Sequence, residues 1–316
     1  MKCLVTGGTG FIGSHLIEAL LAKDMQVTTL VQYTFNGDLG WIDHLKDGVN
    51  IIYGDIRDPG TVARAVHGND CVLHLAASIS IPYSYQNPRE VIETNVLGTL
   101  NVLEATRAYG SRMIHTSTSE VFGTPKTVPI NEQHPVKPQS PYAASKAAAD
   151  RICEAYRCSY GLPITILRPF NTFGPRQSPR AIIPWIILQL LDGDTVKLGN
   201  LDPTRDFTYV KDTVSAMVLA TQAKIDEELN LGTGRDIRMG DLVQLIARLM
   251  DKEAKIEITE GQKRPFGSEV MKLQSDNQLA QKLLGWKPAW NLEDGLRETI
   301  SWFKENRELY KNTNYP

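Results

Sequence analysis

Hydrophobic and polar positions follow two rhythms along the first half of the chain. Short, continuous apolar runs alternate with longer segments whose apolar positions repeat at helical spacing. Continuous apolar runs of this length are typical of parallel strands buried on both faces of a sheet. They predict strands at residues 2–6, 26–31, 49–53, 71–75, 112–116 and 163–167. The segments between them predict helices at residues 11–23, 58–67, 91–109 and 140–160.

This alternation predicts an α/β fold, in which a doubly wound parallel Rossmann sheet is covered by helices on both faces. The rhythm changes after Arg168, where prolines and glycines interrupt shorter segments, and helical patterns return at 210–222, 240–250 and 292–306. We therefore expect a dinucleotide-binding Rossmann domain over residues 1–170, to which the chain returns around 205–235. A smaller C-terminal α/β substrate lobe would comprise residues 171–204 and 236–316.

Composition and charge exclude several classes of protein. Hydrophobic residues make up 42% of the 316 residues and charged residues 22%, which is enough apolar material to exclude extensive disorder. The 34 lysines and arginines balance 36 acidic residues, so the net charge of -2 argues against a nucleic-acid partner. The longest apolar stretch, residues 181–191, is too short for a membrane span of about 20 residues.

The N-terminus and the metal-binding residue types complete these exclusions. The first residues show no pattern of a secretory signal. Four scattered cysteines and six histidines without paired spacing predict free thiols and no metal site. Free thiols in turn favour a cytoplasmic location.

A glycine-rich segment follows the first predicted strand and opens the first predicted helix. Its sequence over residues 7–13 is Gly-Gly-Thr-Gly-Phe-Ile-Gly. Backbone amides at a helix N-terminus bind anions, and glycines let a pyrophosphate approach the chain. We therefore predict a nicotinamide dinucleotide site whose phosphate loop includes Gly7, Gly10, Phe11, Ile12 and Gly13.

The second strand leaves the choice of dinucleotide open. It ends in Leu-Val-Gln-Tyr at residues 30–33, without the carboxylate that usually binds the adenosine ribose. Residues 31–36 also offer no cation for a 2′-phosphate. Asp55, beside Ile56 after the third strand, is placed to accept a hydrogen bond from the adenine amino group. We expect NAD, with NADP left open.

Tyr142 and Lys146 lie four residues apart on a predicted helix, so both side chains share one face. A nearby ammonium should depress the pKa of the phenol, and an oxidised nicotinamide adds positive charge. The resulting phenolate would take a hydroxyl proton while hydride leaves the same carbon. The pair therefore predicts an oxidation of an alcohol.

The fifth strand ends in Thr118-Ser119-Glu120, at the edge where open α/β sheets bind ligands. Thr118 can hydrogen-bond the hydroxyl that Tyr142 deprotonates. Oxidation of an alcohol needs no second base, so Glu120 indicates a further proton transfer at the carbon next to the new ketone.

These residues together resemble the extended short-chain dehydrogenase/reductases that act on nucleotide sugars, and the match runs essentially end to end. The motifs in family order are residues 6–13, His74-Leu75-Ala76-Ala77, Asn95, Tyr142 with Lys146, Arg168-Pro169-Phe170-Asn171 and Arg205-Asp206-Phe207. Residues 118–120 resemble the dehydratases within this family. Residues 35–43, 81–85 and 203–207 resemble the nucleotide-hexosamine 4,6-dehydratases of the legionaminic-acid type.

The resemblance implies roles for matching positions. Leu75, Ala76 and Ala77 would line the cofactor, and Asn95 would lie near the catalytic lysine. The nucleotide sugar would contact Ser80, Tyr83, Asn171, Arg205 and Arg264, with the two arginines clamping phosphates or ribose. Ser119 departs from the pattern, because many glucose dehydratases place there an aspartic acid that protonates the leaving hydroxyl.

Several reactions remain open. In a 4,6-dehydratase, hydride leaves C4, Glu120 removes the C5 proton, the C6 hydroxyl departs and hydride returns to C6. In a C4-epimerase, Glu120 would be incidental. Decarboxylation of a nucleotide uronic acid needs a cation for the carboxylate, and residues 78–87 contain none. A non-catalytic cofactor sensor would not need Tyr142, Lys146 and Thr118 together.

The helices predicted at 91–109 and 141–160 carry apolar and alanine-rich faces. These faces include Val96, Leu100, Leu103, Ala143, Ala147, Ala148 and Ile152. In the family such helices pair across a two-fold axis, so the resemblance implies a homodimer.

Overall fold

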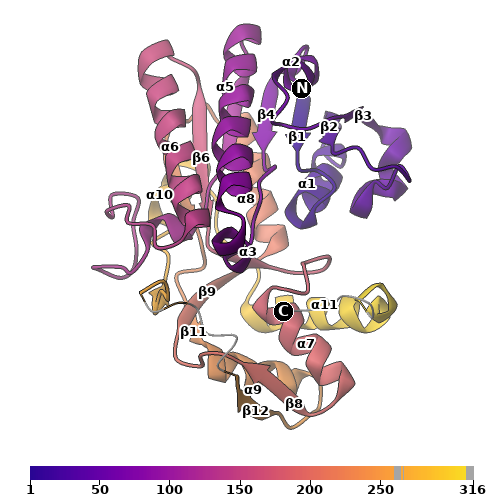
Figure 1. The fold of residues 1–316 in the computed structure, drawn as a ribbon, viewed down its shortest axis with the longest axis vertical. Helices are drawn as coiled ribbons and strands as arrows, with labels where there is room; N and C mark the ends of the chain where they lie inside the picture. Colours follow the sequence, from indigo (N-terminus) through magenta and orange to yellow (C-terminus); the bar gives the residue numbers. More distant parts are fainter. Residues whose placement is uncertain (260–264, 266, 311–316) are drawn as a thin grey trace.

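The computed structural model describes residues 1–259, 265 and 267–310. Its main sheet has seven parallel strands in the order β10-β6-β5-β4-β1-β2-β3 (Figure 1). These are β1 Lys2–Thr6, β2 Gln26–Val31, β3 Val49–Tyr53, β4 Cys71–His74, β5 Arg112–Thr116, β6 Ile164–Pro169 and β10 Glu228–Leu231. The strand order reverses between β1 and β4, which is where such sheets form a ligand crevice. The predicted α/β fold with a parallel Rossmann sheet is confirmed.

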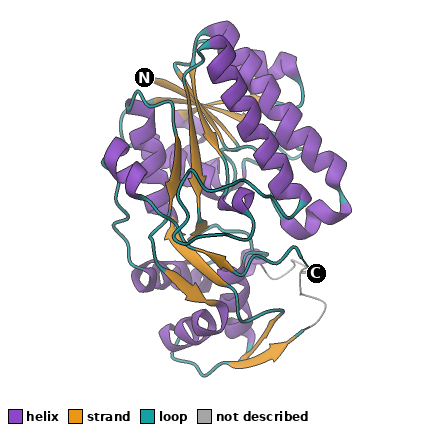
Figure 2. Ribbon diagram, turned by 90° about the vertical axis from the view of Figure 1, so that its left-hand side faces the viewer, coloured by secondary structure: helices purple, strands orange, loops and turns teal. Residues whose placement is uncertain are grey.

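Helices cover both faces of this sheet (Figure 2). On one face α1 Phe11–Leu21 packs against α8 Val210–Gln222. On the other face α5 Gly98–Tyr109 packs against α2 Pro59–Val66 and α6 Pro141–Tyr160. Successive residues of β1 divide between the two cores, because side chains of a strand point alternately to opposite faces. Cys3 and Val5 join one core, and Leu4 joins the other.

The long helix predicted at 91–109 is a compound element. It consists of α4 Pro88–Ile92, a π-helical turn η2 Glu93–Leu97 and then α5. A π-turn is wider than an α-turn and often occurs at functional sites. Here it carries Asn95, whose side chain is turned inward and is 1% exposed.

The C-terminal part forms a smaller lobe below the carboxyl ends of the main strands (Figure 1). Its main sheet is built on β9 Thr204–Tyr209, which pairs with β7 Asn171–Phe173, β11 Asp236–Arg238 and β13 Lys272–Leu273. A second sheet pairs β8 Thr195–Leu198 with β12 Lys255–Ile258. The helices of this lobe are α7 Ile182–Asp192, α9 Met239–Leu249 and α11 Leu292–Glu305, whereas α10 Gln278–Leu284 packs against β10 and α8 of the larger domain. Because β9 belongs to the smaller sheet, the chain returns to the main sheet through α8 and β10; the division into two domains stays a prediction.

The apolar stretch at residues 181–191 forms most of α7, and its side chains Ile183, Ile186 and Leu190 are buried in the core. Within the described residues, no helix is both long and apolar enough to cross a membrane. The four cysteines are free thiols: Cys3, Cys71 and Cys153 are buried and Cys158 is exposed. The described histidines, cysteines and carboxylates form no group that could hold a metal ion.

Candidate active site

A cavity of about 840 Å³ opens at the carboxyl ends of β1, β4 and β5, beside the smaller lobe. Ligand pockets typically measure about 300–1,000 Å³, so this cavity is large enough for a dinucleotide or a sugar nucleotide. It brings together most of the predicted site residues. These are Gly7, Gly10, Phe11, Ile12, Gly13, Asp55, Ile56, Leu75, Ala76, Ala77, Thr118, Ser119, Glu120, Tyr142, Lys146 and Asn171.

The glycine loop has the geometry of an anion site. Gly7 has a φ of +74°, and a Cβ atom there would lie 2.9 Å from the amide nitrogen of Ala76. A Cβ at Gly13 would lie 2.2 Å from the carbonyl oxygen of Gly7. These two glycines let the loop pack tightly, while the exposed Gly10 leaves the first amides of α1 facing the cavity. The loop therefore fits the diphosphate of a nicotinamide dinucleotide.

The adenosine end of the cavity carries a neutralised ion pair. Arg57 lines the cavity beside Asp55, and its Nε and Nη2 atoms donate to the carboxylate at 3.0 and 2.6 Å. The hydrogen bonds from Arg57 hold the pKa of Asp55 below its usual range. Gln32 lines the same end. Because the charge of Arg57 is already balanced by Asp55, this end offers little attraction to an additional 2′-phosphate.

Tyr142 and Lys146 are positioned by the N-terminus of α6. Ser140 caps this helix, since its hydroxyl accepts a hydrogen bond of 3.1 Å from the amide of Ala143. Lys146 lies one turn after Tyr142 and is 4% exposed. Its Nζ donates a hydrogen bond of 2.7 Å to the carbonyl oxygen of Thr116 at the end of β5.

The expectation that Lys146 depresses the pKa of Tyr142 is wrong for this arrangement. Burial, with smaller contributions from the charges of Glu120 and Asp150, raises the pKa of Tyr142 to about 12, and only the hydrogen bond with Thr118 lowers it. Desolvation dominates because the phenol is enclosed, while the ammonium of Lys146 is directed to a backbone carbonyl. Tyr142 is therefore protonated at neutral pH until a bound cation stabilises its phenolate.

Thr118, Ser119 and Glu120 turn sharply after β5 into a 3₁₀-helix, η3 Ser119–Phe122. The hydroxyl of Thr118 caps this turn by accepting a hydrogen bond of 3.3 Å from the amide of Glu120. The turn places the Glu120 carboxylate close enough to Tyr142 to influence its pKa. Both Ser119 and Glu120 line the cavity, but Ser119 is only 3% exposed and carries no charge, so Glu120 is the carboxylate that this turn contributes.

A buried network supports the end of β5 from behind. The Asp150 carboxylate accepts hydrogen bonds from Ser117 at 2.7 Å and from Arg168 at 3.0 and 3.2 Å. His115 Nε2 lies 3.4 Å from the same carboxylate. Although burial raises the pKa of Asp150, the contacts with His115 and Arg168 bring it down to about 2. Asp150 is therefore an anion, and it ties α6 to β5 and β6 beneath Lys146.

Three predicted residues do not line the cavity but hold its walls. Asn95 accepts a hydrogen bond of 2.7 Å from the amide of Ser78 and donates one of 3.0 Å to its carbonyl. Ser80 caps the short helix α3 Ile81–Gln86 by accepting from the amide of Tyr83 at 3.3 Å. The Tyr83 hydroxyl donates to Glu90.

The two predicted arginines have different outcomes. Arg205, on β9, is 6% exposed and its Nη2 lies 3.3 Å from a carboxylate oxygen of Glu269. It is not among the residues that line the cavity. Arg264 lies outside the described residues. The nucleotide contacts implied for both arginines stay predictions.

The cavity also has lining residues that sequence reasoning missed. They include Gln32, Trp41, Arg57, Glu90, Thr94, Thr172, Arg176, Gln177 and Tyr310. Thr172 directly follows the Arg168–Asn171 motif and Arg176 lies four residues further on, so this motif was a signal for them. Trp41 and Tyr310 come from opposite ends of the chain, and local patterns give no indication that they meet one cavity.

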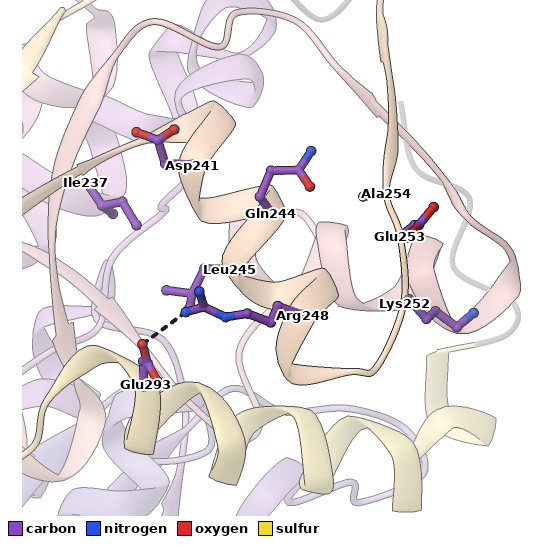
Figure 3. A pocket seen from close by; sticks show the side chains of 9 residues that line it. All are labelled: Ile237, Asp241, Gln244, Leu245, Arg248, Lys252, Glu253, Ala254 and Glu293. Atoms are coloured by element: carbon purple, nitrogen blue, oxygen red, sulfur yellow. Dashed lines mark hydrogen bonds and ion pairs between the residues drawn. The ribbon is translucent and has the colours of Figure 1, made fainter.

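A second hollow of about 690 Å³ lies on the outer surface of the smaller lobe, between α9 and α11 (Figure 3). Its lining mixes charges of both signs, including an ion pair of 3.2 Å between Arg248 and Glu293. None of the described residues that line it belongs to the predicted site. The predicted site residues that line a cavity therefore all lie in the one at the phosphate loop.

Comparisons with known proteins give relatives along nearly the whole chain. Residues 4–299 match the model of the family described as GDP-mannose 4,6 dehydratase. The dTDP-glucose 4,6-dehydratase 1 of Escherichia coli K12 is 33% identical, over 99% of this chain and 95% of that protein. The UDP-glucuronic acid decarboxylase 1 of Xenopus tropicalis is 32% identical, over 99% of this chain and 75% of that protein.

Solved structures give the same range of activities. The dTDP-glucose 4,6-dehydratase DesIV of Streptomyces venezuelae, solved with NAD bound, superposes with a TM-score of 0.90 at 31% identity, covering 98% of this chain and 99% of its own. The UDP-glucose 4-epimerase of Thermus thermophilus, in complex with NAD, gives a TM-score of 0.86 at 32% identity, with coverages of 96% and 99%.

Proposed function

The chain belongs to the NAD-dependent nucleotide-sugar epimerase/dehydratase family of extended short-chain dehydrogenase/reductases, and we propose that it is a 4,6-dehydratase acting on a nucleotide-linked hexosamine such as a nucleotide-linked N-acetylglucosamine. The observation that carries this proposal is the position of Glu120. Its carboxylate shares the cavity with Thr118 and Tyr142 and is close enough to raise the pKa of the phenol. A base beside the alcohol-oxidising pair supports a second proton transfer.

The residues divide the reaction among them. A bound nicotinamide would accept hydride from C4 and return it to C6, which leaves no net oxidation. Thr118 would orient the C4 hydroxyl, and Tyr142 would take its proton. Glu120 would remove the C5 proton, which the neighbouring ketone makes acidic. Ser119 is not acidic, so the group that protonates the departing C6 hydroxyl is either Glu120 itself or lies elsewhere.

The phosphate loop and the neutralised Asp55–Arg57 pair support NAD as the cofactor in preference to NADP. Both DesIV and the Thermus thermophilus epimerase are solved with NAD. The cofactor contacts proposed for this chain are those of the glycine loop, Asp55 with Ile56, and residues Leu75–Ala77. Lys146 would donate to the ribose of the nicotinamide, since this side chain also lines the cavity.

The cations of the cavity argue against uronic acid decarboxylation. Among its described lining residues the cations are Arg57, Lys146 and Arg176. Arg57 is paired with Asp55, Lys146 donates to a carbonyl, and Arg176 Nη2 donates to Glu18 at 2.7 Å. Both guanidiniums therefore already have a carboxylate partner, and Lys146 is assigned to the backbone carbonyl and to the proposed ribose contact, so none of the three cations is left for a C6 carboxylate. C4 epimerisation is the second candidate, because it needs only Thr118, Tyr142 and Lys146.

A panel of UDP-, GDP-, CDP- and dTDP-sugars, incubated with the protein and read by mass spectrometry, tests the proposal. Loss of one water from a nucleotide hexosamine is the expected result. An unchanged mass with a new C4 configuration would establish an epimerase, and loss of carbon dioxide from a uronic acid would establish a decarboxylase. Either outcome would overturn the dehydratase proposal.

A further inference from the structure

The outer wall of the cofactor cavity is aromatic and comes from segments distant in sequence. Trp41 lies in the 3₁₀-helix η1 Gly40–Gly48, between β2 and β3, and Tyr310 ends η5 Arg307–Tyr310 near the C-terminus. Both line the cavity that contains the phosphate loop. In Figure 1, α11 runs toward the side of the molecule that carries the β2–β3 connection.

Trp41 is pressed against the phosphate loop itself. Gly40, which precedes it, has a φ of +56°, and a Cβ there would lie 2.9 Å from the carbonyl oxygen of Thr9. The amide of Trp41 donates a hydrogen bond of 3.4 Å to the same oxygen. Asp38 fixes this turn by accepting a 2.7 Å hydrogen bond from the amide of Gly40. The fully buried Ile42 anchors the other side of the turn, so the indole is held at the loop.

Trp302 of α11 backs the wall and joins its two halves. Its ring lies edge-on to Trp41, with centroids 5.4 Å apart and an interplanar angle of 74°. The same ring lies edge-on to Tyr310 at 5.8 Å and 77°. Phe303 packs on Tyr310 at 5.0 Å. Arg307, at the start of η5, pairs with Asp192 of α7 and ties this segment to the smaller lobe.

The proposed reaction gives such a wall a purpose. Hydride that leaves C4 must return to C6 of the same sugar, so loss of the reduced cofactor during a cycle would strand the ketone intermediate. Amides and hydroxyls of the loop provide hydrogen bonds but exclude little water. Aromatic rings cover a large area at low entropic cost and remove that area from solvent.

We propose that Trp41, Trp302 and Tyr310 form a cofactor-retaining wall, in which Trp41 and Tyr310 enclose the dinucleotide at the phosphate loop and Trp302 holds them together. The wall acts on the dissociation rate of the cofactor and not on the chemical steps. The inference rests on the cofactor cavity of the proposed function, and it holds equally for a dehydratase or an epimerase.

Release of NADH from the full-length protein tests this wall directly. Energy transfer from tryptophan to the reduced nicotinamide reports binding, and displacement by excess NAD in a stopped-flow instrument gives the dissociation rate. We expect Trp41→Ala and Tyr310→Ala to accelerate release roughly ten-fold, as loss of a large aromatic contact implies. Trp41→Phe, which keeps a ring, should release NADH at nearly the wild-type rate. Phe35→Ala is the matched control, because Phe35 precedes Trp41 on the same connection, is 95% exposed and does not line the cavity.

The outcomes distinguish a failure of the wall proposal from a failure of the proposed function. Release at the wild-type rate in both alanine variants, with circular dichroism showing them folded, would overturn the wall. If Trp41→Ala does not fold, Tyr310→Ala alone decides, since Tyr310 lies at the end of the described chain. Equal acceleration by Phe35→Ala would also overturn it. A wild-type protein that binds neither NADH nor NADPH would instead overturn the cofactor assignment.

Discussion

The ammonium of Lys146 donates a 2.7 Å hydrogen bond to the carbonyl oxygen of Thr116. This bond joins α6 to the last residue of β5, immediately before the turn that carries Thr118 and Glu120. The lysine therefore positions the backbone of the proposed proton-transfer groups in addition to its proposed contact with the cofactor ribose. The two active-site elements are tied together a second time because Asp150, one turn later on α6, also holds Ser117.

Replacement of Tyr142 by phenylalanine should abolish turnover while leaving cofactor binding near normal. The ring keeps its packing, but the phenol hydroxyl that exchanges a proton with the C4 hydroxyl of the sugar is gone. Losses of about 10²–10⁴-fold are usual for a general acid–base group. Turnover with the preferred sugar nucleotide and an NADH binding titration measure the two effects. A fall in cofactor affinity as large as the fall in turnover would show that Tyr142 is mainly a binding residue.

Replacement of Glu120 by glutamine should stop the reaction after the first oxidation. The amide keeps the shape of the side chain but takes no proton, so reduced cofactor should accumulate on the enzyme, as measured by its absorbance. Deuterium from heavy water should no longer enter at C5. Glu257→Gln serves as the control, since Glu257 lies exposed on β12, away from the cavity. Full turnover of Glu120→Gln would exclude dehydration as the reaction and favour C4 epimerisation.

Stability should fall in mild acid because His115 is buried as a neutral ring. Burial and the charge of Lys146 lower its pKa to about 4, whereas the unfolded chain titrates near the ordinary value of 6.5. Between these values the unfolded state binds more protons, so the free energy of unfolding rises with pH. From about pH 7 to about pH 5, His115 alone should account for a loss of about 2 kcal/mol.

Urea unfolding at both pH values checks this, with His115→Gln as the comparison. His74, whose pKa burial also lowers, contributes in the same direction and is present in both proteins. The other charged groups that face His115 are Lys146, Asp150 and Arg168. The pKa of Asp150 is about 2 and that of Arg168 is raised, so these two keep their charge throughout this range. If the free energy of unfolding of His115→Gln falls by the same amount between the two pH values, His115 is not responsible for the loss.

The protein should be a homodimer formed through α5 and α6, although part of the predicted face is wrong. Leu103, Ala143 and Ala147 are buried within their own chain and cannot meet a partner. The outer surfaces of these helices instead expose aromatic rings and small residues, including Tyr109, Ala144, Ala155 and Tyr160. Light scattering at micromolar concentration should give twice the chain mass of 35.2 kDa. Ala148→Arg, on the same side of α6, should shift the protein toward the monomer, and a monomeric wild type would refute the arrangement.

Local patterns predicted six of the seven strands of the main sheet, because most of them are buried on both faces and read as apolar runs. The edge strand β3 is partly exposed, and β10, which joins the sheet after β9 of the smaller lobe, was not predicted. The boundaries of β1, β2, β3 and β5 coincide with the predicted ones. The smaller lobe was harder, since its strands are short: β7, β11 and β13 have two or three residues each. Pairing with β9 determines those strands, and a neighbour that is distant in sequence leaves no local periodicity.

The phosphate loop, the Tyr142–Lys146 face and the carboxylate after β5 could be predicted from the chain alone, because these depend on spacing within one turn, one helix or one strand end. The environment of these groups depends on the fold. The fold buried Tyr142 so that its pKa rises to about 12, directed Lys146 to Thr116, and neutralised Arg57 with Asp55. It also brought Trp41 and Tyr310 to one cavity. Solvation and charge depend on every group packed around an atom, and those groups are assembled only when distant segments of the chain meet.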